Sequence, residues 1–143
     1  MLYTPLTKRA MRIAYEAHQG QVDKSGIPYI YHPIHLAEQM TDEYAVCAAL
    51  LHDVVEDTCW TFEALEREGF PAQVMDALRL LTHDDSVPYL DYVARIKENP
   101  VAAAVKRADL CHNSDLSRLD AVDERAIQRV EKYRKAMELL NET

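Results

Sequence analysis

The sequence carries helix-forming signals along nearly its whole length and has only three glycines to interrupt them. Its first segment shows the pattern: Thr4 and Pro5 suit an N-cap and a first helical position, and an apolar stripe from Leu6 to Ala17 then runs at helical spacing until Gly20. No strand-like alternation persists and no internal repeat is visible. These features predict a compact all-α domain built from many helices.

Similar start and stop signals divide the rest of the chain. We expect Asp42 to cap a helix that carries "LLHDVVEDT", Thr61 to cap a short helix that ends at Gly69, and Pro71 to begin another helix. The stretch 20–33 holds two glycines and two prolines and is predicted to be an ordered loop. Further helices are expected from about 33 to 40, over "VPYLDYVARIKE" and "PVAAAVKRADLCHN", and from Asp123 to about Leu140.

Length and charge narrow the classes of protein to consider. A chain of 143 residues is long enough for one hydrophobic core, so we expect a single domain over residues 1–143. The 16 basic residues are outnumbered by 24 acidic ones, and the net charge of −8 argues against general binding of nucleic acid. No apolar run approaches the ~20 residues that cross a bilayer, which argues against a membrane protein. Three scattered cysteines and the absence of a secretory signal favour a reducing cytoplasm.

The segment "LLHDVVEDT" at 50–58 places four ionisable side chains within six positions of an apolar stretch. In one continuous helix, His52 and Glu56 would lie a turn apart, with Asp53 three and four positions before Glu56 and Asp57. Burying such groups without partners is costly, so a cation, bound water or a polar substrate must offset them. The segment is therefore a candidate functional site.

A divalent ion bound by imidazole and carboxylate is the simplest partner for this acidic helix. The chain offers one further histidine in an ordered loop, His32, and one further acid in an apolar helix, Asp109. With His52 and Asp53 these form a candidate set of four nitrogen and oxygen ligands. Such a set suits manganese, iron or another octahedral first-row ion better than structural zinc.

Three segments, "AHQGQVDKSGIPYIYHP", "AALLHDVVEDT" and "VKRADLCHN", in this order and spacing, closely resemble the HD-domain hydrolases of the RelA/SpoT alarmone family, including the stand-alone small alarmone hydrolases. The resemblance covers about residues 9 to 119. It implies the all-helical HD fold and a manganese-dependent removal of the 3′-pyrophosphate from guanosine tetra- or pentaphosphate. The family's metal ligands fall on the same four positions, His32, His52, Asp53 and Asp109.

The resemblance also assigns the remaining site residues. The family's catalytic pair falls on Glu56 and Asp57, which would orient the attacking water and handle its proton. Lys24 and Ser25 would hold phosphate or nucleoside, and Asn113 would bond the ribose or base. From the residues themselves we expect His18 and His112 to be structural or to bond groups next to the site, and His83 to lie on the surface, while Lys106 could equally be a solvated charge.

One position departs from the family pattern. Where the family usually has an Arg-Lys pair, this chain has Asp23 and Lys24, and a carboxylate there adds repulsion against a polyphosphate. Two alternatives to the alarmone hydrolase therefore stay open. One is an HD phosphohydrolase acting on another nucleotide or phosphoester, which Asp23 favours. The other is a non-catalytic nucleotide-binding module, against which stands an intact set of catalytic residue types.

Overall fold

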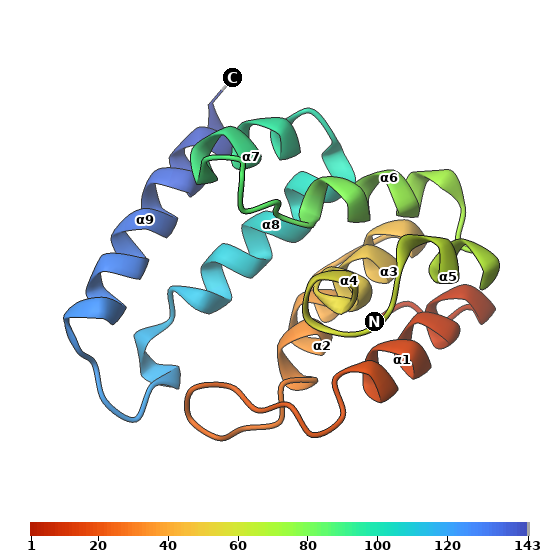
Figure 1. Cartoon of the computed structure of the whole chain (residues 1–143), viewed down its shortest axis with the longest axis horizontal. Helices are drawn as coiled ribbons and strands as arrows, with labels where there is room; N and C mark the ends of the chain where they lie inside the picture. Colours follow the sequence, from red (N-terminus) through yellow and green to blue (C-terminus); the bar gives the residue numbers. More distant parts are fainter. Residues whose placement is uncertain (143) are drawn as a thin grey trace.

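Helices account for the architecture of the protein (Figure 1). The structure is a computed structural model that describes residues 1–142. The all-α prediction is confirmed, since the one β-type contact among these residues is an isolated bridge between Val22 and Pro28. No helix in this part of the chain has the length and apolarity needed to cross a membrane. The elements are α1 (Pro5–Ala17), α2 (Tyr31–Glu38), α3 (Glu43–Leu51), α4 (Val54–Asp57), α5 (Phe62–Arg67), α6 (Ala72–Leu81), α7 (Tyr89–Lys97), α8 (Pro100–Asn113), the 3-10 turn η1 (Leu116–Arg118) and α9 (Glu124–Asn141).

Side-chain caps fix the starts of several helices where the sequence predicts them. Thr4 and Asp42 accept hydrogen bonds from the third backbone N–H of α1 and α3, and Thr61 and Asp123 do the same for α5 and α9. Asn99 caps α8 through two backbone N–H groups. Each cap satisfies donors that a helix leaves free at its first turn, typically worth about 1 kcal/mol.

Helix α3 forms the centre of the core. Every residue from Ala45 to Leu51 is buried, so this helix has no solvated face. Helices α1, α2, α6 and α8 pack around it. A helix that is apolar all round must be enclosed in this way, because it has no polar side to turn toward water. The end of α3 therefore delivers His52 into the interior of the domain.

The helix expected to carry all of "LLHDVVEDT" is instead broken in two. Helix α3 ends at Leu51 and α4 begins at Val54, and Asp53 between them leaves the helical region with φ −106° and ψ 0°. The break turns Asp53 so that its Oδ2 lies 2.9 Å from His52 Nε2. In an unbroken helix adjacent side chains point about 100° apart, so the break is what brings these two groups together.

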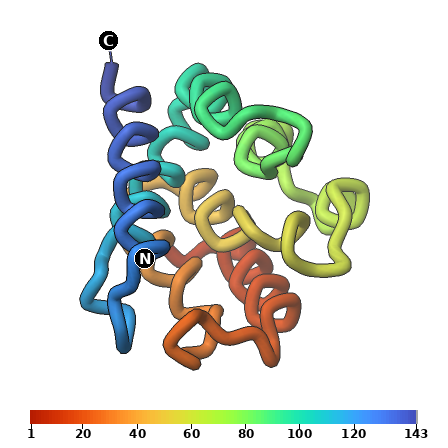
Figure 2. Tube along the Cα trace, turned by 60° about the vertical axis from the view of Figure 1, so that its left-hand side comes forward, coloured from red at the N-terminus to blue at the C-terminus, as the bar shows by residue number. Residues whose placement is uncertain are grey.

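The ordered loop predicted at 20–33 is confirmed for 20–30 and is closed on itself, whereas α2 begins at Tyr31, two residues earlier than expected. Asp23 N–H donates to Ile27 O at 2.8 Å, and Gly26 adopts a positive φ of 79° at the turn. In both overall views the loop lies next to the connection between α8 and α9 (Figures 1 and 2). This places it at the mouth of the site described next.

Candidate active site

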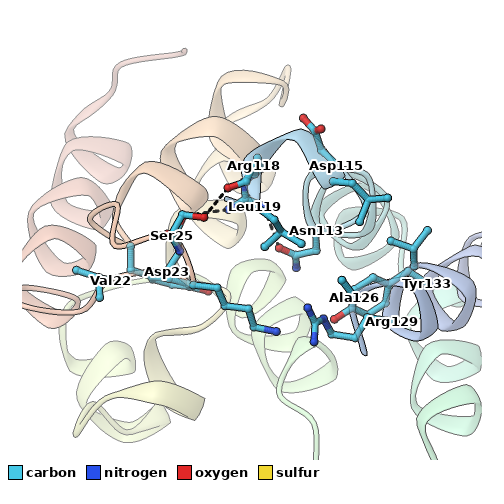
Figure 3. Close-up of a pocket in the computed structure, with 14 residues that line it drawn as sticks. Val22, Asp23, Ser25, Asn113, Asp115, Arg118, Leu119, Ala126, Arg129 and Tyr133 are labelled. Atoms are coloured by element: carbon cyan, nitrogen blue, oxygen red, sulfur yellow. Dashed lines mark hydrogen bonds and ion pairs between the residues drawn. The ribbon is translucent and has the colours of Figure 1, made fainter. Parts of the chain in front are cut away.

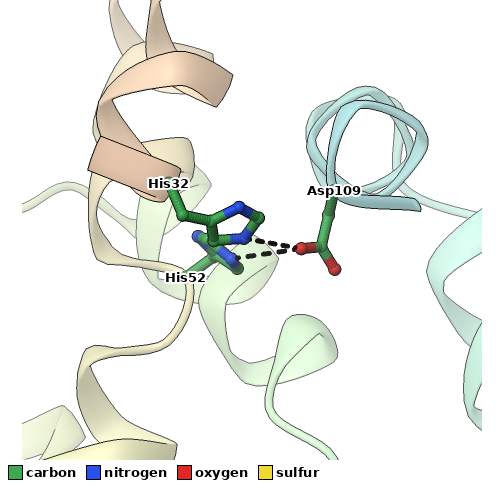
Figure 4. A group of neighbouring side chains, drawn as sticks. All are labelled: His32, His52 and Asp109. Atoms are coloured by element: carbon green, nitrogen blue, oxygen red, sulfur yellow. Dashed lines mark hydrogen bonds and ion pairs between the residues drawn. The ribbon is translucent and has the colours of Figure 1, made fainter. Parts of the chain in front are cut away.

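Three helices bring His32, His52 and Asp109 together in the interior (Figure 4). His32 lies at the start of α2, His52 follows α3, and Asp109 lies on α8. His32 Nε2 is 2.9 Å and His52 Nε2 is 3.6 Å from the same Asp109 oxygen, Oδ1. The three residues are 3 to 7% exposed, so water is largely excluded from the cluster.

The hydrogen bonds on the far side of each ring indicate how the imidazoles are protonated. His52 Nδ1 lies 2.7 Å from Ala49 O, which can only accept, so Nδ1 carries a proton. His32 Nδ1 lies 2.7 Å from His112 Nδ1. Burial and then Arg118 lower the pKa of His112 to about 4, so His112 is neutral near pH 7. A neutral His112 can accept a hydrogen bond from the Nδ1–H group of His32. Each ring then turns its Nε2 atom toward carboxylate oxygens, where a proton or a cation lies between nitrogen and oxygen.

Such an arrangement of imidazole nitrogens and carboxylate oxygens fits a cation. His52 Nε2 is buried and makes no hydrogen bond within the described chain, although it lies close to Asp53 and Asp109. Burial alone would lower the pKa of His52, but these two carboxylates outweigh burial and raise it well above 6.5. A proton or a metal ion is therefore strongly favoured at this point. The donor set, two imidazole nitrogens and carboxylate oxygens with Nδ1–H groups held from behind, is typical of a divalent metal site.

Lys106 balances part of the negative charge and is not solvated. Its Nζ donates to Asp109 Oδ2 at 3.0 Å, and the residue is 9% exposed. Burial alone would raise the pKa of Asp109, but Lys106 first, then His32 and His52, lower it well below 3.8. Asp109 is therefore ionised, with one oxygen fixed by Lys106 and the other directed at the histidines.

Asp53 joins this cluster to the catalytic pair expected from the sequence. One oxygen each of Asp53, Glu56 and Asp57 lies within 4.8 Å of the others. The Tyr29 hydroxyl donates to Asp53 Oδ2, the oxygen that also faces His52. Burial and Asp53 raise the pKa of Tyr29, so the phenol keeps its proton and acts as a donor. Tyr29 thereby helps to hold the carboxylate against the histidine.

Glu56 and Asp57 lie at the exposed end of this acidic group, and the pKa of each carboxyl is raised. For both side chains the main cause is burial, and neighbouring carboxylates add to it. Glu56 Oε1 accepts the backbone N–H of His83 at 2.8 Å, and the side chain of Gln21 donates to Asp57 O at 3.0 Å. His83 is thus half-buried beside the site, whereas the sequence placed it on the surface. These contacts hold the α4 turn in place.

A cavity of about 350 Å³ opens beside the cluster and is lined by all three residues expected to bind substrate, Lys24, Ser25 and Asn113 (Figure 3). Asn113 Nδ2 donates to Asp109 Oδ1 at 3.0 Å, so this side chain belongs to both the cavity and the cluster. Tyr29 also lines the cavity. Ser25 Oγ donates to Arg118 O at 2.7 Å and ties the loop to η1, which the sequence did not predict.

Basic side chains outnumber acidic ones in this cavity, although the whole chain is acidic. Its lining includes Lys24, Arg118 and Arg129 against Asp23 and Asp115. Partial burial and then Arg129 lower the pKa of Lys24, so the two cations lie near each other. In residues 1–142 neither of them forms an ion pair. The cavity therefore presents two cations to an anionic ligand.

Sequence reasoning missed Tyr29, His83, Arg118 and Arg129 and left Lys106 open. Lys106 had a local signal, since it precedes Asp109 by three positions on the same helix. Tyr29 and His83 reach their partners across 24 and 27 positions, and no spacing rule links such residues.

Comparison with known proteins finds relatives over most of the chain. Residues 10–139 match the family described as "HD domain". The chain is 37% identical to the guanosine-3′,5′-bis(diphosphate) 3′-pyrophosphohydrolase MESH1 of Danio rerio over 91% of this chain and 79% of that protein. A solved structure described as a metazoan ortholog of SpoT that hydrolyzes ppGpp superposes with a TM-score of 0.81 and 29% identity, covering 100% of this chain and 89% of the other.

Bacterial relatives are much longer. The chain is 36% identical to the guanosine-3′,5′-bis(diphosphate) 3′-pyrophosphohydrolase of Haemophilus influenzae over 71% of its own length, which is 17% of that protein. It is 45% identical to the bifunctional (p)ppGpp synthase/hydrolase SpoT of Escherichia coli over 64% of its own length, which is 14% of SpoT. The chain thus spans less than a fifth of these two relatives.

Proposed function

The chain belongs to the HD-domain family, and from this premise we propose that it is a metal-dependent hydrolase that removes the 3′-pyrophosphate of guanosine tetra- or pentaphosphate. The observation that carries the proposal is a buried His-His-Asp cluster adjoining a cavity with two unpaired cations. The names of the Danio rerio and Haemophilus influenzae relatives support the choice of substrate. The proposal includes a single catalytic domain over residues 1–143 and a cytoplasmic location.

In this proposal His32, His52, Asp53 and Asp109 hold a divalent ion, with manganese as the metal. Two Nε2 atoms that face carboxylate oxygens, with both Nδ1 atoms engaged elsewhere, support these assignments. When bound, the ion would polarise a phosphoryl oxygen and lower the pKa of a water molecule. The protein's own contribution is to keep the four side chains ionised or correctly protonated and largely free of water.

Glu56 and Asp57 orient the attacking water and take up its proton. Their raised pKa values support this role, because a carboxylate with a higher pKa is a stronger base near neutral pH. The His83 N–H bond holds Glu56 Oε1, which leaves Oε2 available to accept the proton. Asp57 is held through its backbone by Gln21.

Lys24 and Arg129 bind the phosphate groups, and Asn113 bonds the ribose or base. Their common position around one cavity supports these roles. Asn113 also touches Asp109, so a nucleotide held by Asn113 would lie next to the buried cluster. Ser25 contributes by fixing the loop, because its hydroxyl proton is already donated to Arg118 O.

A second candidate, hydrolysis of another nucleotide or phosphoester, is favoured by Asp23. This carboxylate lines the cavity at the position where the family usually has arginine. The chemistry at the buried cluster would be the same, and only the leaving nucleotide would differ.

The test is release of pyrophosphate from guanosine tetraphosphate by chelator-treated protein, with and without added manganese, magnesium or zinc. Manganese-dependent release by the wild type, together with its loss in Glu56→Gln, would support the first proposal. If metal binds but guanosine tetraphosphate is unchanged, a panel of nucleotides, dinucleotide cofactors and simple phosphoesters tests the second candidate. Nucleotide binding without turnover of any member would contradict both candidates.

A further inference from the structure

Asp23 has a structural role that its charge alone does not reveal. Its Oδ1 accepts the backbone N–H groups of Ser25 at 2.8 Å and Ile27 at 3.0 Å. These two bonds, with the positive φ of Gly26, close the loop that carries Lys24. An aspartate here therefore shapes the loop, but it also introduces a negative charge at a cavity proposed to bind phosphates.

Arg118 lies against that negative charge. Its Nη2 is 3.7 Å from Asp23 Oδ2, and both side chains are half-buried, at 25 and 20% exposure. The Nη1 atom donates to His112 O at 2.8 Å and more weakly to Asn113 Oδ1 at 3.4 Å. Its backbone oxygen accepts the Ser25 hydroxyl at 2.7 Å (Figure 3). One residue thus contacts the loop, the end of α8 and a proposed substrate-binding side chain.

We propose that Arg118 is a positioning residue of the cavity: it neutralises Asp23 and fixes the loop and Asn113 so that the cavity accepts a phosphorylated ligand. This inference rests on the proposed function, because it concerns the same cavity. It explains how an aspartate can replace a family arginine without making the cavity repel anions. The charge that offsets Asp23 comes from Arg118 in the α8–α9 connection.

The effect on Asn113 follows from hydrogen-bond geometry. Arg118 can only donate, so Asn113 directs its oxygen at Arg118 and its NH₂ group at Asp109. Without Arg118, the amide loses the partner that fixes this orientation. The charge effect is separate: removal of Arg118 leaves Asp23 uncompensated in a site of low exposure, where charges act more strongly than in bulk water.

A simpler role for Arg118 would be to stabilise the end of α8 through its bond to His112 O. The two roles differ in how they respond to Asp23. If Arg118 acts by neutralising Asp23, then Asp23→Asn should rescue an Arg118→Ala variant, because asparagine keeps the Oδ1 acceptor and lacks the charge. If Arg118 only supports α8, the second substitution should rescue nothing.

The experiment measures kcat and KM for guanosine tetraphosphate with manganese in Arg118→Ala, Arg118→Lys, Asp23→Asn and the Arg118→Ala/Asp23→Asn double variant. Arg118→Ala should raise KM about tenfold, the size of one lost charge-assisted contact, with kcat within about twofold. The double variant should recover most of that loss. Arg118→Lys should fall between the wild type and Arg118→Ala, since lysine keeps the charge without the planar fork.

Arg79→Ala is the matched control, because Arg79 is also an ion-paired arginine, bound to Glu66 on the protein surface away from the cavity. It should leave KM unchanged. Thermal unfolding of each variant identifies any that has lost its fold. A double variant no better than Arg118→Ala would overturn the proposal.

A second arm separates this inference from the choice of substrate. Calorimetric titration with inorganic pyrophosphate, in the Glu56→Gln background with manganese present, measures anion binding without turnover. The same order of affinities is expected: weaker in Arg118→Ala and recovered in the double variant. If this order appears while guanosine tetraphosphate is not hydrolysed, the proposed function fails and the role of Arg118 stands. Equal pyrophosphate affinity in the wild type and Arg118→Ala would contradict the role of Arg118.

Discussion

The buried cluster of His32, His52 and Asp109 and the cavity beside it meet at Tyr29 and Asn113, but the two regions satisfy their charges in different ways. In the cluster, His32, His52 and Asp109 come from three helices, and their polar atoms face one another or other protein groups. In the cavity, side chains from a loop, a short turn and α9 face solvent, and Lys24 and Arg129 are left for a ligand. Folding alone sets the geometry of the buried cluster, whereas the cavity keeps two cations that a bound anion would neutralise.

This difference separates the residues proposed to set substrate preference from those proposed to perform the chemistry. Asp23 adds a negative charge to the cavity, and Arg118 Nη2 lies 3.7 Å from its Oδ2. A comparable change inside the cluster would leave a buried charge without a partner, which typically costs about 3–5 kcal/mol. We therefore expect substitutions in the cluster to have larger effects than substitutions in the cavity.

The largest effect is expected for Asp109→Asn. This change removes a proposed ligand and leaves Lys106 buried without its carboxylate, so both metal binding and stability should fall. Turnover should drop by about 10³-fold or more, because metal catalysis supplies several kcal/mol. Elemental analysis after dialysis, thermal unfolding and pyrophosphate release measure the three effects. Asp76→Asn, on the exposed side of α6, is the matched control. Full metal content in Asp109→Asn would refute the assignment of Asp109 as a metal ligand.

Glu56→Gln should separate chemistry from metal binding. The amide keeps the shape and the bond from His83 N–H but cannot take up a proton, so turnover should fall about 10²- to 10⁴-fold with metal content unchanged. Single-turnover assays and metal analysis check this result. Glu63→Gln, at an exposed position of α5, serves as the control. Wild-type turnover in Glu56→Gln would exclude Glu56 as the proposed base.

His112→Asn tests the group behind a proposed ligand. Loss of the ring that contacts His32 Nδ1 should weaken metal affinity about 10- to 100-fold, as for other groups that orient metal ligands. Competition with a chelating dye measures the affinity. His35→Asn is the control, because it removes a ring that lies tilted against His112 and keeps the bond between His112 and His32. Equal affinities in the two variants would argue against this role.

The same variant has a predicted pH signature in metal-free protein. The pKa of His112 is about 4 in the fold against 6.5 ordinarily, so between these values the unfolded chain binds a proton that the folded chain does not. His112 should therefore make the free energy of unfolding decrease as pH falls from 6.5 to 4. Urea unfolding at several pH values should show a shallower decrease in His112→Asn, and an unchanged slope would contradict the prediction.

The smallest effect is expected for Lys24→Ala in the cavity. Loss of one phosphate contact should raise KM for guanosine tetraphosphate about tenfold, with kcat and metal content unchanged. Steady-state kinetics in parallel with Lys8→Ala, an exposed lysine on α1, measures the change. A fall in kcat as large as that in Glu56→Gln would remove the distinction between the two regions.

Much of the fold followed from local patterns. Cap residues such as Thr4, Asp42 and Asp123 act within three positions, so their effects are visible in the sequence. The apolar stripes likewise depend only on spacing along one helix. The residue types of the candidate ligands were also evident, because ionisable side chains in apolar segments require a partner. The sequence therefore indicated the helices and the kind of chemistry.

Other features depend on contacts between distant segments. No glycine or proline near Asp53 indicates the helix break in the sequence. Only the folded structure shows that the break brings Asp53 Oδ2 close to His52 Nε2. The Ser25–Arg118 contact spans 93 positions. Local propensities act over a few residues, whereas the pairing of buried charges depends on which helices pack side by side. The sequence alone thus predicted the helices and the types of candidate ligand. Tertiary packing brought the histidine nitrogens and carboxylate oxygens together and set the balance of charges in the cavity.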